Sequence, residues 1–222
     1  MSGWSNLAER FKGDLIGPSH ASYDEQRAIW NGDFDKRPLV IARCSSVADV
    51  QVAVDFARHH DLLLAVRAGG HSYPGHSTCD GGILVDLSGL RQVITDPQAR
   101  TVRIQGGALL GDVDRATAAH GMAMPAGIVS HTGMGGLSLG GGFGYTSRMF
   151  GLTCDAFLQL TLVTAEGKVV KASAAENPDL FWGLRGGGGN FGIVTEFECR
   201  MHPLTQVHAG WLYFPMEQAE EI

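Results

Sequence analysis

Apolar positions in the first third of the chain alternate between strand-like runs and helical spacing. Pro38 opens an apolar run that predicts a strand over residues 39–42. Ser46 is a suitable N-cap, and the apolar residues after it recur at spacings of three and four as far as His60, which predicts an amphipathic helix. Residues 62–66 form another apolar run and predict a buried strand. Strand, helix and strand therefore make up the first unit.

Farther along the chain the pattern favours hairpins. The predicted elements are a strand over 83–87, a hairpin that joins 92–95 to 101–105 through Asp96-Pro97, a helix over 108–120 closed by Gly121, a hairpin that joins 157–164 to 168–172, a helix over 177–184 with Pro178 in its first turn, and a strand over 192–202. Because hairpins occur as often as strands that flank helices, we expect an α+β fold rather than a regular doubly wound sheet.

The two ends of the chain differ from its middle. Residues 1–37 are polar and irregular apart from a short helix expected over 24–30, and we interpret them as an N-terminal strap. At the other end, residues 211–214 predict an opening strand and 216–222 the first two turns of a helix. We therefore expect residues 205–222 to be the start of a further domain that is truncated at Ile222.

Composition and charge narrow the range of functions. The chain is 44% hydrophobic and 18% charged, so it is expected to fold, and no apolar run approaches the ~20 residues that a transmembrane helix needs. The opening sequence MSGWSNLAERF has no apolar segment of a secretory signal. A net charge of −6 argues against a nucleic-acid surface. We expect a cytoplasmic protein without membrane or nucleic-acid partners.

Four cysteines are scattered along the chain, at positions 44, 79, 154 and 199. No two of them have CxxC spacing, so neither a zinc site nor thioredoxin-like chemistry is expected, and we predict no metal. We expect four reduced and mostly buried thiols.

Glycine is the one unusual component. It occupies 31 of 222 positions, about twice its usual share, and most of the excess falls in clusters at 67–72, 127–144 and 186–189. Glycine lets the backbone approach a ligand closely, and successive N–H groups can surround an anion, so a diphosphate is the expected guest. A P-loop is excluded because Gly167-Lys168 is followed by Val169. Residues 187–192 match GxGxxG but open a strand, which excludes a dinucleotide fingerprint.

The order and spacing of six motifs carry a family resemblance. They are Val66-Arg67-Ala68-Gly69-Gly70-His71-Ser72, Gly82-Ile83-Leu84-Val85-Asp86-Leu87-Ser88, Pro125-Ala126-Gly127, Gly135-Gly136-Leu137-Ser138-Leu139-Gly140-Gly141-Gly142-Phe143-Gly144, Phe181-Trp182-Gly183-Leu184-Arg185-Gly186 and Asn190-Phe191-Gly192-Ile193-Val194-Thr195. Together they resemble the FAD-linked oxidases. The resemblance is strongest to the berberine-bridge-enzyme-like and hydroxynicotine-oxidase-like branch, which has a p-cresol methylhydroxylase-type FAD-binding domain. It covers about residues 38–204.

This resemblance implies an FAD-binding domain over 38–204, made of two α+β subdomains with the cofactor between them. Loop 67–73 would wrap the pyrophosphate with backbone amides, and the ring of His71 would be joined to the C8-methyl group of the flavin. Residues 125–138 would line the ring system and the ribityl chain. The implied FAD-binding residues are Arg67, Ala68, Gly69, Gly70, His71, Ser72, Tyr73, Pro125, Ala126, Gly127, Thr132, Gly133, Gly135, Gly136, Ser138, Gly142, Gly192, Ile193 and Val194.

Two positions depart from the family pattern. Val129 stands where members with two covalent links carry a cysteine, so a single tether through His71 is expected. Cys154 is the nearest other thiol in sequence, but it lies in the following segment. Thr132, just before Gly133, stands where an aliphatic residue usually controls access of oxygen. His76 and His131 are expected to be solvated or hydrogen-bonded, and Asp155 and Arg185 to make structural hydrogen bonds.

The resemblance implies a flavin-dependent oxidoreductase. It would take a hydride from a hydroxyl- or amine-bearing carbon of a small molecule and pass the electrons to oxygen. Two alternatives stay open, namely a flavin dehydrogenase with another acceptor, which Thr132 allows, and a non-catalytic FAD-binding fragment. The sequence specifies neither the substrate nor the catalytic base, which the resemblance places in the part of the family fold that follows the FAD-binding domain.

Overall fold

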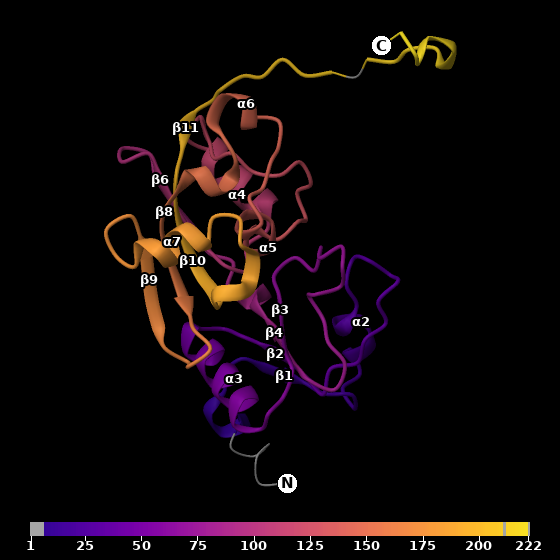
Figure 1. Ribbon diagram of the computed structural model, residues 1–222, viewed down its shortest axis with the longest axis vertical. Coiled ribbons are helices and arrows are strands. Elements are labelled where there is room, and N and C mark those ends of the chain that lie inside the picture. Colours follow the sequence, from indigo (N-terminus) through magenta and orange to yellow (C-terminus); the bar gives the residue numbers. More distant parts are fainter. Residues whose placement is uncertain (1–6, 211, 222) are drawn as a thin grey trace.

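Two β-sheets organise the computed structural model, which describes residues 7–210 and 212–221 (Figure 1). The first sheet, at the lower end of Figure 1, consists of β1 (Asp14–Ile16), β2 (Val40–Arg43), β3 (Leu64–Arg67) and β4 (Ile83–Asp86) in the order β1-β2-β4-β3. The last three of these strands are parallel to one another, whereas β1 runs antiparallel to β2. All four residues of β4 are buried, as expected of a central parallel strand.

Helix α3 (Val47–His59) makes the crossover from β2 to β3. The hydroxyl of Ser46 accepts a hydrogen bond from the amide of Asp49 at 3.2 Å, which confirms the predicted N-cap. Val50, Ala53 and Val54 on one face of α3 pack into the core of the first sheet. The predicted strand–helix–strand unit is confirmed.

The second sheet is antiparallel throughout. Its strands, in the order β5-β6-β10-β8-β9, are β5 (Val93–Asp96), β6 (Thr101–Gln105), β10 (Ile193–Arg200), β8 (Phe157–Val163) and β9 (Val169–Ser173). Helix α4 (Leu110–Ala118) lies against this sheet and shares its core with α7 (Pro178–Gly183). The predicted hairpins 92–105 and 157–172 are therefore confirmed, and so is the α+β class.

The two sheets share packing and hydrogen bonds. Val163 of β8 and Ile193 of β10 are buried in the core of the first sheet. The side-chain amide of Gln51 on α3 donates to the carbonyl oxygen of Gly167 at 2.7 Å, at the turn between β8 and β9. The two halves therefore pack as neighbours, and the loops between them are held from both sides.

Shorter elements complete the described chain. They are α2 (Tyr23–Arg27), η1 (Leu87–Gly89), β7 (Met122–Ala123), α5 (Met134–Leu139), α6 (Ser147–Phe150), η2 (Thr153–Ala156), η3 (Gly188–Phe191), β11 (His202–Pro203) and η4 (Met216–Gln218). Strands β7 and β11 pair with each other. None of the described helices is long and apolar enough to cross a membrane.

Three local predictions differ from the structure. Residues 14–16, expected to be irregular, form β1 because the edge of β2 supplies backbone partners. Residues 134–139 form helix α5 within the second glycine cluster. The strand predicted over 211–214 is wrong for 212–214, where Leu212 and Tyr213 are 85% and 86% exposed and pair with no described strand, while Trp211 lies outside the described residues. The helix predicted over 216–222 is reduced to η4, and Ile222 is also outside the description.

Candidate cofactor site

Loops from both sheets meet backbone to backbone at the end of β3. A Cβ atom on Gly69 would overlap the backbone nitrogen of Gly133, and one on Gly135 would lie 2.9 Å from the carbonyl oxygen of Gly106. The amide of Leu110 donates to the carbonyl of Thr132 at 2.9 Å, which ties the loop before α5 to the start of α4. Side chains at these glycines would separate the loops, so the glycines permit a contact within the protein.

The loop after β3 presents unpaired backbone donors. No acceptor among the described residues receives a hydrogen bond from the amides of residues 69–73. Gly70 has a φ of +71°, a left-handed conformation that glycine adopts without strain. A run of free amides next to a left-handed glycine is the geometry that surrounds phosphate oxygens in anion-binding loops. The loop therefore fits the pyrophosphate of FAD.

Two buried hydroxyls follow in the same loop. Ser77 Oγ and Thr78 Oγ1 are buried and have no hydrogen-bond partner within the described chain. Upstream of them, the hydroxyl of Ser72 accepts a hydrogen bond from the amide of His76 at 2.9 Å, and the carbonyl of Ser72 accepts one from the amide of Gly75 at 3.1 Å. Buried hydroxyls normally have hydrogen-bond partners, so these two hydroxyls are available to a ligand in addition to the free amides of the loop.

His71 lies between two other rings. Its Nε2 is 2.7 Å from Nδ1 of His131, which precedes α5. The indole of Trp30 stacks on the imidazole of His71 with ring centroids 5.4 Å apart and an interplanar angle of 17°. Burial, and next the neighbouring His131, lower the pKa of His71. The His71 side chain is thus neutral, oriented and only partly covered.

The Arg67 side chain binds to other groups of the protein. Its Nη2 lies 2.9 Å from Oδ2 of Asp86, and its Nη1 donates to the carbonyls of Gln26 and Ala28. Burial alone would raise the pKa of the Asp86 carboxyl, but the Arg67 guanidinium and the hydrogen bonds from Ser88 outweigh it and hold this pKa below its usual value. The Arg67 side chain therefore anchors the base of the loop and does not reach out to a ligand.

The remaining predicted residues divide into two groups. Gly133 and Gly135 lie against the His71 loop, at Gly69 and Ala68. In contrast, the Ser138 hydroxyl donates to the carbonyl of Met134 at 2.6 Å and is buried, Gly142 packs on Thr153, and Gly192 packs on the backbone of Val163. The side chains of Ile193 and Val194 are buried in the two cores, so only their backbone could face a cofactor.

Exposed apolar side chains adjoin the loop that carries His131. We call Ile128, Val129, Phe143, Tyr145 and Met149 the apolar rim. Gly144 packs directly on the carbonyl of Ala126, which leaves no room for a Cβ atom and brings together the two segments that carry these side chains. Cys154 is buried behind this region, and burial raises the pKa of its thiol. A buried, protonated thiol is a poor nucleophile.

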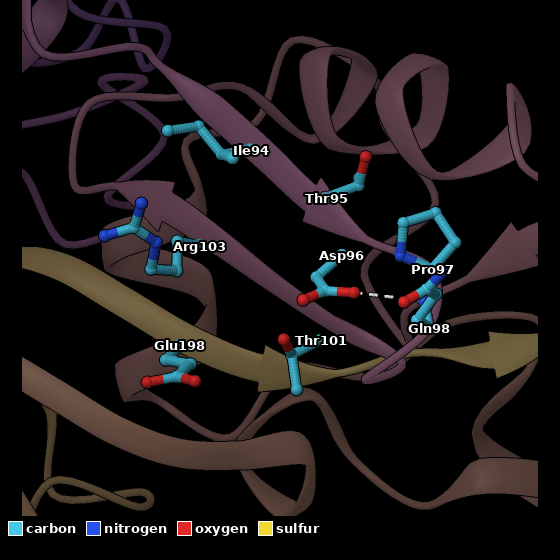
Figure 2. A pocket seen from close by; sticks show the side chains of 8 residues that line it. All are labelled: Ile94, Thr95, Asp96, Pro97, Gln98, Thr101, Arg103 and Glu198. Carbon is cyan, nitrogen blue, oxygen red and sulfur yellow. Dashed lines mark hydrogen bonds between the residues drawn. The ribbon is translucent and has the colours of Figure 1, made fainter.

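A separate cavity of about 680 Å³ lies at the hairpin of β5 and β6 (Figure 2). It is lined by Ile94, Thr95, Asp96, Pro97, Gln98, Thr101, Arg103 and Glu198. Asp96 accepts hydrogen bonds from the amides of Gln98 and Ala99 and so serves the turn. The cavity includes Thr101, at the start of β6. The backbone of Gly106, just after the other end of β6, instead packs on Gly135 beside the His71 loop, so this cavity is distinct from the candidate site.

Sequence reasoning missed two ring contacts of His71, with Trp30 and with His131. Trp30 comes from the N-terminal segment, where nothing in the pattern marks it. His131 was expected only to be solvated or hydrogen-bonded, and its partner proves to be His71.

Asp155 accepts a hydrogen bond from the amide of Leu152 at 2.8 Å, which confirms its structural role. Arg185 instead lies over the ring of Phe181 at 4.9 Å.

Comparison with known proteins places this geometry in a family. The family model described as an FAD binding domain matches residues 38–173. An FAD-linked oxidoreductase from Dictyostelium discoideum is 40% identical over 192 residues, which are 86% of this chain and 42% of that protein. The (R)-6-hydroxynicotine oxidase of Paenarthrobacter nicotinovorans is 40% identical over 193 residues, or 87% of this chain and 42% of the oxidase.

Solved structures agree with these matches. The 6-hydroxy-D-nicotine oxidase of Arthrobacter nicotinovorans superposes with a TM-score of 0.86 at 40% identity and covers 87% of this chain and 43% of its own. A chitooligosaccharide oxidase gives 0.84 at 33% identity, with 91% and 44% covered. Two variants of Phl p 4, described as a glucose dehydrogenase and a glucose oxidase, both give 0.85 at 32% identity, with 91% and 44% covered.

The chain thus spans somewhat less than half the length of the relatives it matches. The family model covers more than half of this chain, and its residues include the His71 loop and the loop that carries His131. The chain therefore belongs to the FAD-binding domain family of the FAD-linked oxidoreductases, with the p-cresol methylhydroxylase-type fold found in its hydroxynicotine-oxidase-like and berberine-bridge-enzyme-like relatives.

Proposed function

We propose that this chain is the FAD-binding part of an oxidoreductase that takes a hydride from a hydroxyl- or amine-bearing carbon of a small molecule and passes the electrons to oxygen. The run of free amides over residues 69–73, which includes His71, carries the proposal. FAD, when bound, supplies the hydride acceptor. Within this proposal residues 38–204 form the FAD-binding domain, with 1–37 as a strap.

The pyrophosphate would be held by neutral donors. The free amides and the hydroxyls of Ser77 and Thr78 offer hydrogen bonds, while the nearest buried cation, Arg67, is already paired with Asp86. Charge-assisted hydrogen bonds from amides to phosphate are strong enough to serve without a side-chain cation.

A single covalent bond would join FAD to His71. The pKa of this ring is lowered, first by burial and then by His131, so it is neutral at physiological pH and has a free lone pair. No second link is expected because Val129 has no thiol and Cys154 is buried.

The fold is compatible with two kinds of electron acceptor, oxygen or another oxidant. Variants of Phl p 4 described as a glucose dehydrogenase and a glucose oxidase share this fold, so the fold allows either outcome. Thr132 puts a hydroxyl where an aliphatic side chain is the family pattern. We propose oxygen as the electron acceptor because hydroxynicotine oxidase and chitooligosaccharide oxidase are among the relatives.

The apolar rim would border the substrate. Ile128 and Phe143 are 56% and 74% exposed, and the described residues offer no opposing wall. Substrate must be held in near-attack geometry against the flavin. We propose that the whole protein completes the pocket over this rim and supplies the catalytic base there.

Cofactor attachment is the sharpest test. The purified chain, loaded with FAD and precipitated with acid, should keep its yellow colour in the pellet, whereas His71→Ala should release the colour into the supernatant. His76→Ala is the matched control, since His76 is an exposed histidine of the same loop. Colour that stays with the His71→Ala pellet would disprove attachment at His71, and failure of the wild-type chain to bind FAD would disprove the proposed function.

A further inference from the structure

We propose that His131 is a positioning residue for His71, which holds the imidazole in one orientation and takes up the ring proton that His71 loses when it bonds to the flavin. This inference rests on the proposed function, since it concerns the same attachment. It assigns a role to a residue that the sequence left as a solvated or hydrogen-bonded histidine. Trp30 assists by stacking on a face of the His71 ring.

The contacts fix the His71 ring from two directions. His131 Nδ1 lies 2.7 Å from His71 Nε2, and the two rings are tilted by 39° with their centroids 4.6 Å apart. Trp30 stacks on the ring face at 5.4 Å, and its backbone amide donates to the carbonyl of Gly70 at 3.1 Å, so the indole is tied to the same loop. A rotation of the imidazole would break the first contact and disturb the second.

The hydrogen bond also selects a tautomer. Either His71 carries its proton on Nε2 and donates to His131, or both rings carry their protons on Nδ1 and His131 donates. A neutral imidazole side chain prefers the Nε2–H form, and the first arrangement gives both rings that form. We therefore assign His71 Nε2 as donor and His131 Nδ1 as acceptor, which leaves Nδ1 of His71 with a free lone pair.

With this tautomer, the His71 ring has both a lone pair for the new bond and a proton to release. A bond forms from Nδ1 of His71 to the carbon of the flavin C8-methyl group, and one C–H bond of that methyl group breaks. The Nε2 proton of His71, made acidic by the new bond, passes to His131. The proton of the broken C–H bond would pass to water, and its electron pair would pass through the flavin to oxygen, which together with the two released protons would become hydrogen peroxide.

Lowering of the His71 pKa by burial and by His131 agrees with this role, because only a neutral ring has a lone pair to donate. The side chain of His131 is itself exposed, so it can exchange the proton it receives with water and return to its starting state. Its exposure also means that substitutions there leave the packed cores intact.

The test compares His131→Leu, which removes the acceptor, with His131→Asn, which keeps an oxygen acceptor at about the same distance from the backbone. The first measurement uses the FAD-free chain, in which the nitrogen-15 shifts of the His71 ring report its tautomer. We expect the Nε2–H form in the wild type and a mixture in His131→Leu. The second measurement is the rate of covalent attachment after FAD is added in air. We expect it to fall about 100-fold in His131→Leu and to recover in part in His131→Asn.

His76→Leu is the control, because the side chain of His76 lies in the same loop and contacts neither ring. Wild-type attachment rate and an unchanged His71 tautomer in His131→Leu would overturn the inference. If the wild-type chain binds FAD but never attaches it, the covalent bond and the proton transfer to His131 are both wrong. The tautomer measurement alone then decides whether His131 orients His71. Failure of the wild-type chain to bind FAD at all would instead contradict the proposed function.

Discussion

Arg67 and Asp86 are direct neighbours on the parallel strands β3 and β4, and their side chains form an ion pair of 2.9 Å that is almost wholly shielded from solvent. The carboxylate also accepts a hydrogen bond from the amide of Ser88, and the guanidinium reaches the carbonyls of the N-terminal segment. This pair therefore joins the sheet, the N-terminal segment and the loop that begins after Arg67.

Breaking this pair should be costly. Arg67→Met removes the nearer of the two guanidinium groups that pair with the buried Asp86 carboxylate and leaves only Arg43, at 3.4 Å. We expect a loss of up to about 3–5 kcal/mol in the free energy of unfolding, measured in denaturant. Arg37→Met is the matched control, because Arg37 and its partner Asp24 are both exposed, and no measurable loss is expected there. Equal stability of the two variants would mean that the buried pair is not needed to hold the loop.

Gly69 should not accept even one methyl group. A Cβ atom there would overlap the backbone of Gly133, so Gly69→Ala must separate the two loops, at a cost of about 1–3 kcal/mol and with weaker FAD binding. Gly189→Ala meets nothing within 4 Å and should be neutral. Thermal unfolding and flavin fluorescence titration would measure both effects. An unchanged affinity in Gly69→Ala would show that the loops can part without harm.

The sequence predicted most strands and the long helix, because their periodicity or turn residues are local. It also located the glycine loops, although for a partly different reason: at Gly69 and Gly133 the glycines allow two loops to touch. Strand β1 and the stacking of Trp30 on His71 were not predictable, since each depends on partners distant in the chain. Helix α5 was missed because glycine lowers helix propensity, and the packing of Met134 and Leu139 overrides it.

Stability should fall as the pH drops below about 6.5, the ordinary pKa of histidine. The pKa of His71 is lowered by burial and by His131, and that of His202 by burial and then by Arg200 and Arg100. The unfolded chain therefore binds more protons than the native chain in this range, which weakens the native state. The loss should begin as the pH falls through the ordinary histidine pKa of about 6.5, grow as the pH falls further, and be absent well above that value.

Urea unfolding at pH 7.5 and 5.5 measures this difference. His71→Gln should reduce the loss at the lower pH, because one of the two perturbed histidines is gone. The Asp86 pKa is lowered, so that carboxylate loses its contribution only at more acidic pH and does not interfere. A wild-type chain equally stable at both values would contradict the prediction.

A thiol at position 129 should create a second attachment point. Val129 is 39% exposed on the apolar rim, in the loop that also carries His131. In a His71→Ala background, Val129→Cys should keep flavin on the acid-precipitated protein, whereas His71→Ala alone should not. Cys154 is present and buried in both variants and serves as the internal control. Release of all flavin from the double variant would place Val129 away from the cofactor.

The burial of Val163 and Ile193 in the first core has a consequence for how the chain is made. The other buried residues of that core lie between Leu7 and Leu90, so the ribosome must add about a hundred more residues before the core can close. Contacts of such sequence separation form late and slowly. Until then the emerging first sheet exposes apolar surface, which makes it a substrate for chaperones, and slower translation or lower temperature should raise the yield of folded protein.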